Sequence, residues 1–483
     1  MIGITSYGAY IPWYRMNRKI IFDQMGWFNM ANVAHARGEK AIANYDEDTI
    51  TMAYAAAADC MGDKSRDGVD GLYLASMSLP FAQRQNAIVV SDALDFRSSI
   101  RGADFTGSLK SGSMALLSAL DMVGSGNDSS VMVCASDSRV GKPGSSQEYT
   151  YGDGAAALLV GREGVIAEFK GSYSVSHDFV DYRRLPTERF EHGWEERWIR
   201  DEGYSKIIPE AAVGLARKYN LKISDFAKVV IACPVTGALT GLVKILGAAP
   251  EQIQDNLMAN VGDTGTAMPL MMLVAALEEA KAGDKILVLS YGSGSDAIYF
   301  EATDEIEKVK KSRKGVKGYL SARNDLTIYG KYQAFRNLVP MEVGIRGEMV
   351  SATAMSVLWR EGRGVSALVG SRCKVCGTPQ YPKRRICINP ECDAVDQMED
   401  YRFSDKKSVL TSYTGDNLAF SWDPPQIYGL ADFEGGGRIL FDLTDCALDS
   451  LRVGMPVSMS FRRKYVDTQR GFYGYYWKAV PVK

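Results

Sequence analysis

Two kinds of hydrophobic segment alternate along the first 300 residues of the chain. Short runs rich in β-branched residues are separated by longer stretches rich in alanine and other small residues. The short runs are apolar at consecutive positions, which is typical of strands buried on both faces of a sheet. The alternation therefore predicts an α/β fold in which helices cover the sheet.

This strand and helix pattern occurs twice. The first copy has a helix at about 109–122 and strands over 71–76, 131–137 and 154–161. The second copy has a helix at about 265–281 and strands over 229–234, 286–292 and 296–302. Leu72 and Val131 are 59 residues apart, and Val229 and Ile286 are 57 apart. We expect a duplicated core, although any two βαβ segments can look alike by chance.

The pattern changes towards the C-terminus. Residues 306–316 carry many charges without an apolar period, and we interpret them as a solvated connector or surface turn. From about residue 366 a cysteine cluster is followed by short alternating strands, such as 438–443 and 455–461. Such strands are typical of a small β-barrel.

Length and charge narrow the function classes. The 483 residues exceed what one hydrophobic core supports, so two or three domains are expected. The net charge is −2, which predicts neither nucleic-acid binding nor attraction to an anionic membrane. The N-terminus lacks signal-peptide order, and no apolar run approaches the roughly 20 residues of a membrane span. We expect a cytoplasmic protein.

Four of the eight cysteines are close together in the sequence. Cys373, Cys376, Cys387 and Cys392 have the spacing C-x2-C-x10-C-x4-C, which suits tetrahedral zinc. Because four thiolates leave no open coordination position, the predicted zinc is structural. Unpaired surface thiols and a metal-free remnant are the alternatives. The stretch GSRCKVCGTPQYPKRRIC and the strands after it resemble the acyl-CoA-associated OB-fold family with a rubredoxin-like zinc ribbon.

The N-terminal region resembles the hydroxymethylglutaryl-CoA synthases, especially the archaeal type. The resemblance lies in GITSYGAYIPWYR, GEKAIANYDEDTITMAYAAA, SYGSGSDA and YLSARNDLTIYGKYQAFRNL. It implies a duplicated thiolase fold of five layers (α-β-α-β-α), CoA thioester substrates and at least a dimer. The expected domains are 1–165 and 166–350 for the two thiolase-like halves, 366–397 for the zinc ribbon and 398–483 for the OB-fold.

The resemblance also implies three catalytic positions, and all three differ here. The family's general base, nucleophilic cysteine and ketone-binding histidine correspond to Met77, Leu109 and Ala232. Leucine cannot form the thiolate that a helix N-terminus would stabilise. None of the three histidines, His35, His177 and His192, falls in the segment expected for the catalytic imidazole. A covalent acyl-enzyme at the usual position is therefore not expected.

Other residues of the implied site remain as candidates. For proton transfer and charge stabilisation we consider Lys110, Asp263 and Tyr291, and for a displaced nucleophile Cys233. For contact with the thioester, partly through backbone amides, we consider Asn260, Gly262, Ser290 and Gly292. Each could instead close a turn or pack the core, and Asp153 before a buried strand is best explained as turn chemistry.

Three functions fit these features. The first is aldol or retro-aldol chemistry on a 3-hydroxyacyl-CoA, a lyase reaction that needs a base and an oxyanion site but no acyl-enzyme. The second is a non-catalytic subunit that binds or channels acyl-CoA for a partner thiolase. The third is acyl transfer of the synthase type through Cys233. A homodimer, or a complex with a thiolase-family protein, is the expected assembly.

Overall fold

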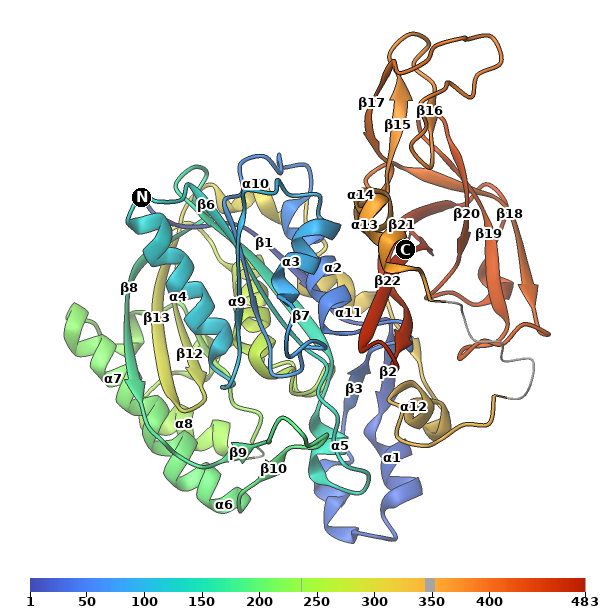
Figure 1. The fold of residues 1–483 in the computed structure, drawn as a ribbon. Helices are drawn as coiled ribbons and strands as arrows, with labels where there is room; N and C mark the ends of the chain where they lie inside the picture. Colours follow the sequence, from blue (N-terminus) through green and yellow to red (C-terminus); the bar gives the residue numbers. More distant parts are fainter. Residues whose placement is uncertain (236, 344–351, 483) are drawn as a thin grey trace. The chain divides into compact units, whose positions relative to one another are not determined.

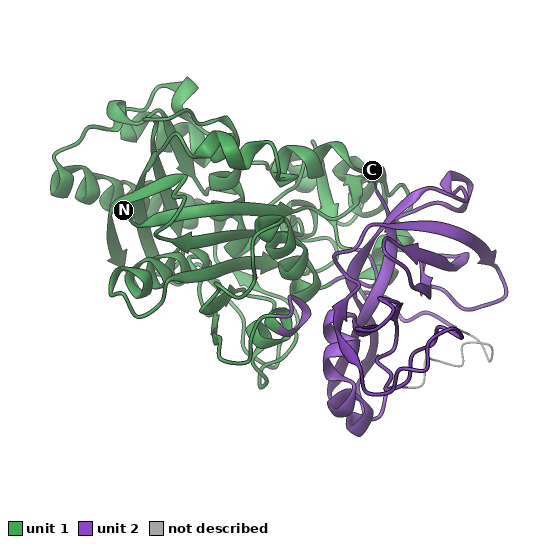
Figure 2. Ribbon diagram, turned by 90° about the horizontal axis from the view of Figure 1, so that it is seen from above, with its two compact units in different colours: residues 1–43, 48–91, 96–336 green, residues 44–47, 92–95, 337–483 purple. Residues whose placement is uncertain are grey.

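The computed structural model describes residues 1–235, 237–343 and 352–482 (Figure 1). Its contacts divide the chain into two compact units (Figure 2). Unit 1 consists of Met1–Ala43, Asp48–Ser91 and Phe96–Arg336. Unit 2 consists of Asn44–Glu47, Asp92–Asp95 and Asn337–Lys483. The boundary predicted at residue 350 lies outside the described residues.

Nine strands of the described chain form the main sheet of unit 1. In spatial order they are β11 (Lys228–Ile231), β12 (Lys285–Tyr291), β13 (Gly294–Ala302), β8 (Ala167–Ser176), β1 (Gly3–Tyr10), β7 (Gly154–Gly161), β6 (Ser130–Asp137), β4 (Gly71–Ala75) and β5 (Arg101–Phe105). β4 is parallel to β6, which is antiparallel to β7. The second half repeats this arrangement, because β11 is parallel to β12, which is antiparallel to β13. The predicted duplicated α/β fold is confirmed.

Helices cover both faces of this sheet. The longer ones are α2 (Thr49–Met61), α3 (Asn86–Ala93), α4 (Ser111–Gly124), α7 (Ser205–Tyr219), α8 (Ala238–Leu246) and α9 (Met268–Glu279). Residues of α4 and α9 share one hydrophobic cluster with strands of both halves, so these two helices form the central layer. α7 and α8 pack in a second cluster against the other face of β11–β13, while α2 packs on β1 and β7.

The strand β12 shows why the sequence is apolar at consecutive positions. Ile286 and Val288 point into the central cluster, whereas Leu287 and Leu289 belong to the cluster with α7 and α8. Successive strand side chains point to opposite faces, and both faces are covered here. An uninterrupted apolar run is the consequence.

Short elements complete unit 1. They are β2 (Tyr14–Asn17), β3 (Glu39–Ile42), β14 (Asn324–Asp325), β9 (Tyr182–Arg183), β10 (His192–Gly193), α1 (Arg18–Met25), α5 (Ser146–Thr150), α6 (Glu196–Trp198), α10 (Ile306–Lys310), α11 (Gly315–Ser321) and α12 (Tyr329–Phe335). The interpretation of 306–316 as a solvated connector is wrong, because Ile306, Val309 and Val316 are buried in the central cluster. Their apolar positions are too few to stand out against the lysines between them.

The described residues of unit 2 form two small sheets and two short helices. The helices are α13 (Met355–Arg360) and α14 (Gly362–Ala367), and the three-stranded sheet is β16 (Pro379–Gln380), β15 (Val369–Cys373) and β17 (Met398–Arg402). The five-stranded sheet is β20 (Arg438–Asp442), β19 (Gln426–Phe433), β18 (Ser408–Asp416), β21 (Pro456–Asp467) and β22 (Phe472–Pro481). A bridge between Leu443 and Ala479 joins its two edges, as expected for a barrel. Phe461 and the fully buried Trp477 lie in its core.

None of the helices in the described chain combines the length and apolar character that crossing a membrane requires.

We predict that Gly112→Ala lowers the stability of unit 1. A Cβ at Gly112 would lie 2.4 Å from the backbone oxygen of Thr266, so α4 could no longer pack at its present distance. Overpacking of this kind costs about 1–3 kcal/mol. Calorimetric melting of the full chain should show a lower melting temperature.

Gly124→Ala is the matched control on the same helix. A Cβ there meets nothing closer than 3.8 Å, at Ile2. Alanine in a helix is favoured over glycine by about 0.5–1 kcal/mol, so this variant should melt at or above the wild-type temperature. Equal melting of Gly112→Ala and wild type would contradict the proposed packing of the central layer.

Candidate functional site

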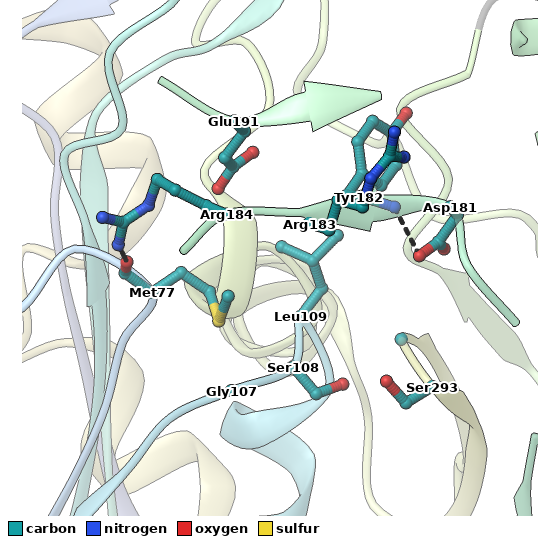
Figure 3. Close-up of a pocket in the computed structure, with 11 residues that line it drawn as sticks. Met77, Gly107, Ser108, Leu109, Asp181, Tyr182, Arg183, Arg184, Glu191 and Ser293 are labelled. Carbon is teal, nitrogen blue, oxygen red and sulfur yellow. Dashed lines mark hydrogen bonds between the residues drawn. The ribbon is translucent and has the colours of Figure 1, made fainter. Parts of the chain in front are cut away.

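A pocket of about 40 Å³ lies beside the N-terminal end of α4 (Figure 3). Its lining residues are Met77, Gly107, Ser108, Leu109, Asp181, Tyr182, Arg183, Arg184, Glu191, Gly292 and Ser293. The lining combines two apolar side chains, Met77 and Leu109, with a group of charged side chains from residues 181–191. The pocket therefore offers an apolar wall opposite a polar one.

The apolar wall is formed by two of the three residues that the sequence analysis assigned to the family's catalytic positions. Met77 follows β4, and Leu109 stands two residues before α4 begins. Ala232, the third position, is 7% exposed and belongs to the central cluster. Among the described lining residues there is no cysteine and no histidine. The described lining therefore offers no thiolate for nucleophilic catalysis.

The backbone of Met77 is held by a buried carboxylate that the sequence analysis did not single out. Asp137 ends β6 and accepts hydrogen bonds from the Met77 amide (2.8 Å) and from the hydroxyls of Ser76 (2.8 Å) and Ser78 (2.7 Å). Its second oxygen accepts bonds from the Thr266 amide (2.8 Å) and hydroxyl (2.9 Å). Burial raises the pKa of Asp137. The signal for Asp137 that the sequence offered is an acidic residue at the end of a buried strand.

Asp263, a predicted site residue, is paired with a buried arginine. Its carboxylate lies 2.6 Å from the guanidinium of Arg139, and it also accepts a bond from the Gly265 amide (2.9 Å). Arg139 lies 3.4 Å from Glu191, whose carboxylate accepts a bond from the Tyr151 hydroxyl (2.5 Å). Although burial opposes its charge, the two carboxylates raise the pKa of Arg139 well above its ordinary value. Asp263 is thus held in a buried ion pair.

Lys110 is also paired within the protein. Its ammonium lies 3.5 Å from Asp296 and 3.3 Å from the carbonyl oxygen of Val175. The other oxygen of Asp296 accepts a bond from the Ser113 hydroxyl (2.5 Å), which lies 2.7 Å from the hydroxyl of Ser290. Lys110 and Ser290 do not line the described pocket. The structure brings these two predicted residues together around Asp296.

Tyr291 and Cys233 pack in the cluster formed with α7 and α8. The ring of Tyr291 stacks on Tyr204, with 3.9 Å between the ring centroids. Burial and the nearby Asp181 carboxylate raise the pKa of Tyr291. Burial also raises the pKa of Cys233 to about 12, so its thiol stays protonated at neutral pH.

A second cavity, of about 270 Å³, includes Cys233 in its wall. Its remaining lining residues are Arg18, Ala34, His35, Thr150, Pro234, Val235, Gly237, Leu239, Asn256, Met258 and Ala259. The charge of Asp263 acts on Tyr182 in the first pocket and on Cys233 in this one. Asp263 itself lines neither cavity.

The predicted thioester-binding residues have different surroundings. Asn260 is exposed. Gly262 has φ +95°, and a Cβ there would lie 2.7 Å from the backbone oxygen of Thr150. Gly292 lines the first pocket, and its amide donates to the carbonyl oxygen of Gly294 (3.0 Å). The Gly292 amide is thus already satisfied, and the roles predicted for these residues stay predictions.

The polar wall of the pocket was not found from the sequence. Asp181 is 7% exposed, and burial raises the pKa of its carboxyl group, which accepts a bond from the Tyr182 amide (2.6 Å). Arg184 donates to the carbonyl oxygen of Met77 (3.0 Å), as Figure 3 shows. The segment 177–193 has no hydrophobic period that marks it as part of a core. Its density of charged residues was the one signal available.

The four predicted zinc ligands lie together in unit 2. The sulfur atoms of Cys373, Cys376, Cys387 and Cys392 all lie within 4.8 Å of one another. Two pairs, Cys373–Cys392 and Cys376–Cys387, are 3.9 and 3.5 Å apart. Zinc–sulfur bonds of about 2.3 Å in a tetrahedron place sulfurs about 3.8 Å apart, so the residues fit a zinc ion. Gly377, at φ +77°, allows the turn between the first ligands and β16.

Family models identify this part of the chain. Residues 360–399 match the model described as "ChsH2, rubredoxin-like zinc ribbon domain". Residues 402–462 match "ChsH2, C-terminal OB-fold domain". The predicted zinc ribbon and OB-fold are confirmed.

We predict that the purified protein carries about one zinc ion per chain and that Cys387→Ser removes it, because three thiolates bind zinc more weakly than four. Elemental analysis measures the metal, and limited proteolysis reports the loosening of the ribbon. Cys446→Ser, a change to a cysteine of unit 2 outside the cluster, should leave both unchanged. Undiminished zinc in Cys387→Ser would contradict the assignment.

Solved structures of the same fold resemble the chain at low identity. A crystal structure of HMG-CoA synthase complexed with CoA has a TM-score of 0.62 and 20% identity, covering 73% of this chain and 95% of that one. MvaS in complex with 3-hydroxy-3-methylglutaryl coenzyme A has a TM-score of 0.61 and 17% identity, covering 70% and 92%. The 3-oxoacyl-(acyl carrier protein) synthase III of Pseudomonas aeruginosa has a TM-score of 0.55 and 16% identity, covering 62% and 98%. These likenesses establish the thiolase-type fold.

Several curated proteins are more similar to this chain in sequence than these solved structures are. The hydroxymethylglutaryl-CoA synthase of Methanopyrus kandleri is 32% identical over 338 residues, which are 68% of this chain and 96% of the relative. That of Methanocaldococcus jannaschii is 33% identical over 351 residues, or 71% and 100%. That of Pyrococcus furiosus is 32% identical over 340 residues, or 68% and 95%. Matches of this identity over nearly the whole length of the relatives show that the chain belongs to the hydroxymethylglutaryl-CoA synthase family.

Proposed function

We propose that the protein makes or cleaves the bond between the second and third carbons of a 3-hydroxyacyl-CoA by aldol chemistry, without an acyl-enzyme. The observation that carries the proposal is the composition of one pocket. Met77 and Leu109 line it, at positions where the family resemblance implies reactive groups, and the desolvated carboxyl group of Asp181 lines the same space. A base remains available although the nucleophile is absent.

The proposed step needs only a base and a site for negative charge. The Asp181 carboxylate accepts the proton of the 3-hydroxyl group. The electrons of that O–H bond form the carbonyl of the leaving aldehyde or ketone, the bond between the second and third carbons breaks, and its electrons pass to the thioester as an enolate. Asp181 then returns the proton to the second carbon, so the residue ends as it began.

Two hydroxyl groups of the pocket are our candidates to support the enolate. Ser108 and Ser293 line the pocket, and their hydroxyls point toward one another in Figure 3. Ser293 has φ +45°, a conformation that is costly for a residue with a side chain and that is often found at functional sites. We assign to this pair the hydrogen bonds to the thioester oxygen, in place of the Gly292 amide, which already donates to Gly294.

The second cavity is the place that we assign to the pantetheine arm of CoA. A neighbouring fold was solved as a complex with CoA and another with 3-hydroxy-3-methylglutaryl coenzyme A. In this chain the cavity of about 270 Å³ has Arg18 and His35 in its lining. The Arg18 guanidinium is cationic and suits the phosphate groups to which the pantetheine arm of CoA is attached.

A non-catalytic acyl-CoA-binding subunit is the second candidate, because the family resemblance implies that Met77, Leu109 and Ala232 stand at the family's catalytic positions. Purified protein that binds CoA thioesters and cleaves no 3-hydroxyacyl-CoA would favour it. We also propose that the protein acts in the cytoplasm, either as a homodimer or in a complex with a thiolase-family protein. Copurification with a cysteine-bearing thiolase would point to the complex.

We predict that labelled acetyl-CoA leaves no acetyl group on the protein. Leu109 has no nucleophile, and a Cys233 thiol with a pKa of about 12 is not ionised at neutral pH. Peptide mass spectrometry after acid quenching makes the measurement, with a cysteine-bearing synthase of the family as the positive control. An acetylated Cys233 peptide would restore the synthase mechanism.

We predict that Asp181→Asn lowers kcat/KM for 3-hydroxyacyl-CoA cleavage about a hundredfold or more, the size expected for loss of a general base. Burial raises the pKa of Asp181, so wild-type kcat/KM should fall as pH drops through a value above the ordinary carboxyl range. This fall of kcat/KM at low pH should be absent in Asp181→Asn. Asp178→Asn, a change to a nearby exposed carboxylate, should leave rate and profile unchanged, and equal effects of the two changes would exclude Asp181.

A further inference from the structure

We infer that Arg139 is a positioning residue that holds the hairpin of residues 181–194 in place by binding Glu191. This hairpin contains β9, β10 and Asp181. The inference rests on the proposed function, because that function makes Asp181 the base. It assigns to the site a residue that does not line the pocket, and it gives Arg139 a role beyond neutralising Asp263.

The hairpin has little hydrophobic anchoring of its own. Asp181 is buried, but the residues from 182 to 194 are half-buried or exposed. Its internal hydrogen bonds include the pairing of β9 with β10 and a bond from the Trp194 amide to the carbonyl oxygen of Asp181 (2.8 Å). A segment with few buried apolar contacts opens readily unless specific polar contacts attach it to the core.

Glu191 provides a buried polar attachment of this kind. Its side chain is 8% exposed, and its carboxylate lies 3.4 Å from the guanidinium of Arg139 and accepts a bond from the Tyr151 hydroxyl (2.5 Å). Arg184 is exposed and attaches the hairpin through a bond to the carbonyl oxygen of Met77 (3.0 Å). Hydrogen bonds between charged groups are stronger where water is excluded, so we expect the contact of Glu191 to hold the hairpin more firmly.

Arg139 is itself fixed in the core. Its guanidinium lies 2.6 Å from the carboxylate of Asp263, donates to the carbonyl oxygen of the same residue (3.2 Å) and lies over the ring of Tyr151, 4.0 Å from its centroid. Its own carbonyl oxygen accepts a bond from Arg336 (2.8 Å), which is paired with Asp153 (2.8 Å). Contacts on several sides fix the conformation of the arginine, and they give the hairpin a rigid partner.

The pairing of β9 with β10 extends this restraint to Asp181. Glu191 directly precedes β10 and Asp181 directly precedes β9, and Gly193 of β10 pairs with Tyr182 of β9. Figure 3 shows Asp181, Tyr182 and Glu191 on these two neighbouring stretches of chain. A general base must lie within hydrogen-bond reach of the proton that it removes, so a displacement of about 1 Å is enough to slow the reaction.

Hydrogen exchange of the full chain, measured by mass spectrometry on peptides that cover residues 181–194, tests the positioning without a substrate. Glu191→Leu removes the attachment and leaves Asp263 with its partner, so the hairpin amides should exchange about tenfold faster. Arg139→Gln should have the same effect. The double variant should exchange no faster than Arg139→Gln, because both changes break one contact. Arg139→Lys should restore part of the protection, since an ammonium keeps the charge without the second arm of a guanidinium.

Cleavage of a 3-hydroxyacyl-CoA, assayed where calorimetry shows each variant to be folded, tests the effect on the base. Glu191→Leu and Arg139→Gln should each lower kcat about tenfold or more and change KM little, because the base moves while the second cavity keeps its lining. Arg200→Leu is the matched control. It breaks an exposed ion pair with Asp201 (2.7 Å) and should leave exchange, kcat and KM unchanged.

Unchanged hairpin exchange in both Glu191→Leu and Arg139→Gln would overturn the inference and leave the proposed function intact. Faster exchange with an unchanged kcat would also overturn it, because the hairpin would then move without effect on the reaction. If Arg139→Gln does not fold, Glu191→Leu decides the same question. A wild type that cleaves no 3-hydroxyacyl-CoA would contradict the proposed function, whereas the exchange data would still decide whether Arg139 holds the hairpin.

Discussion

The buried carboxylate of Asp137 is the interaction on which the pocket depends. It accepts hydrogen bonds from Ser76, Met77 and Ser78 in the first half of the duplicated core and from Thr266 in the second. A charge taken out of water is stable only when fully bonded, so this one carboxylate ties the end of β4 to the start of the central helix α9. The close contact of Gly112 with the Thr266 backbone completes that joint.

The pocket beside α4 has its ionisable side chains on a different wall from the one that the family resemblance predicts. At the end of β4 and before α4, where the family resemblance places a base and a thiol, the chain has Met77 and Leu109. Ionisable side chains line the opposite wall instead, on the segment that carries Asp181, Arg184 and Glu191. A fold can keep its layers while its chemistry changes, because the layers depend on buried apolar area and the chemistry on a few side chains at their edges. Aldol chemistry fits this change, since it needs a base and no covalent intermediate.

Unit 2 depends on a different kind of stabilisation. Its zinc ribbon is small, and a tetrahedral metal site replaces the core that so few residues cannot build. The barrel that follows closes through the bridge between Leu443 and Ala479 around Phe461 and Trp477. Family models match both parts, and neither contributes a residue to the described pocket of unit 1.

The sequence by itself determined the elements and the metal site. Apolar runs such as 286–289 predict strands buried on both faces, and the spacing of four cysteines predicts a zinc site, because both patterns are local and follow from strand and tetrahedral geometry. It did not reveal that Ile306, Val309 and Val316 are core residues, since charged neighbours obscure their period. Only the tertiary structure determined which side chains lie together at the candidate site. It paired Lys110 with Asp296 and Asp263 with Arg139, and it brought Asp181 from a polar segment to Leu109, because residues distant in the chain meet by folding and leave no periodic trace in the sequence.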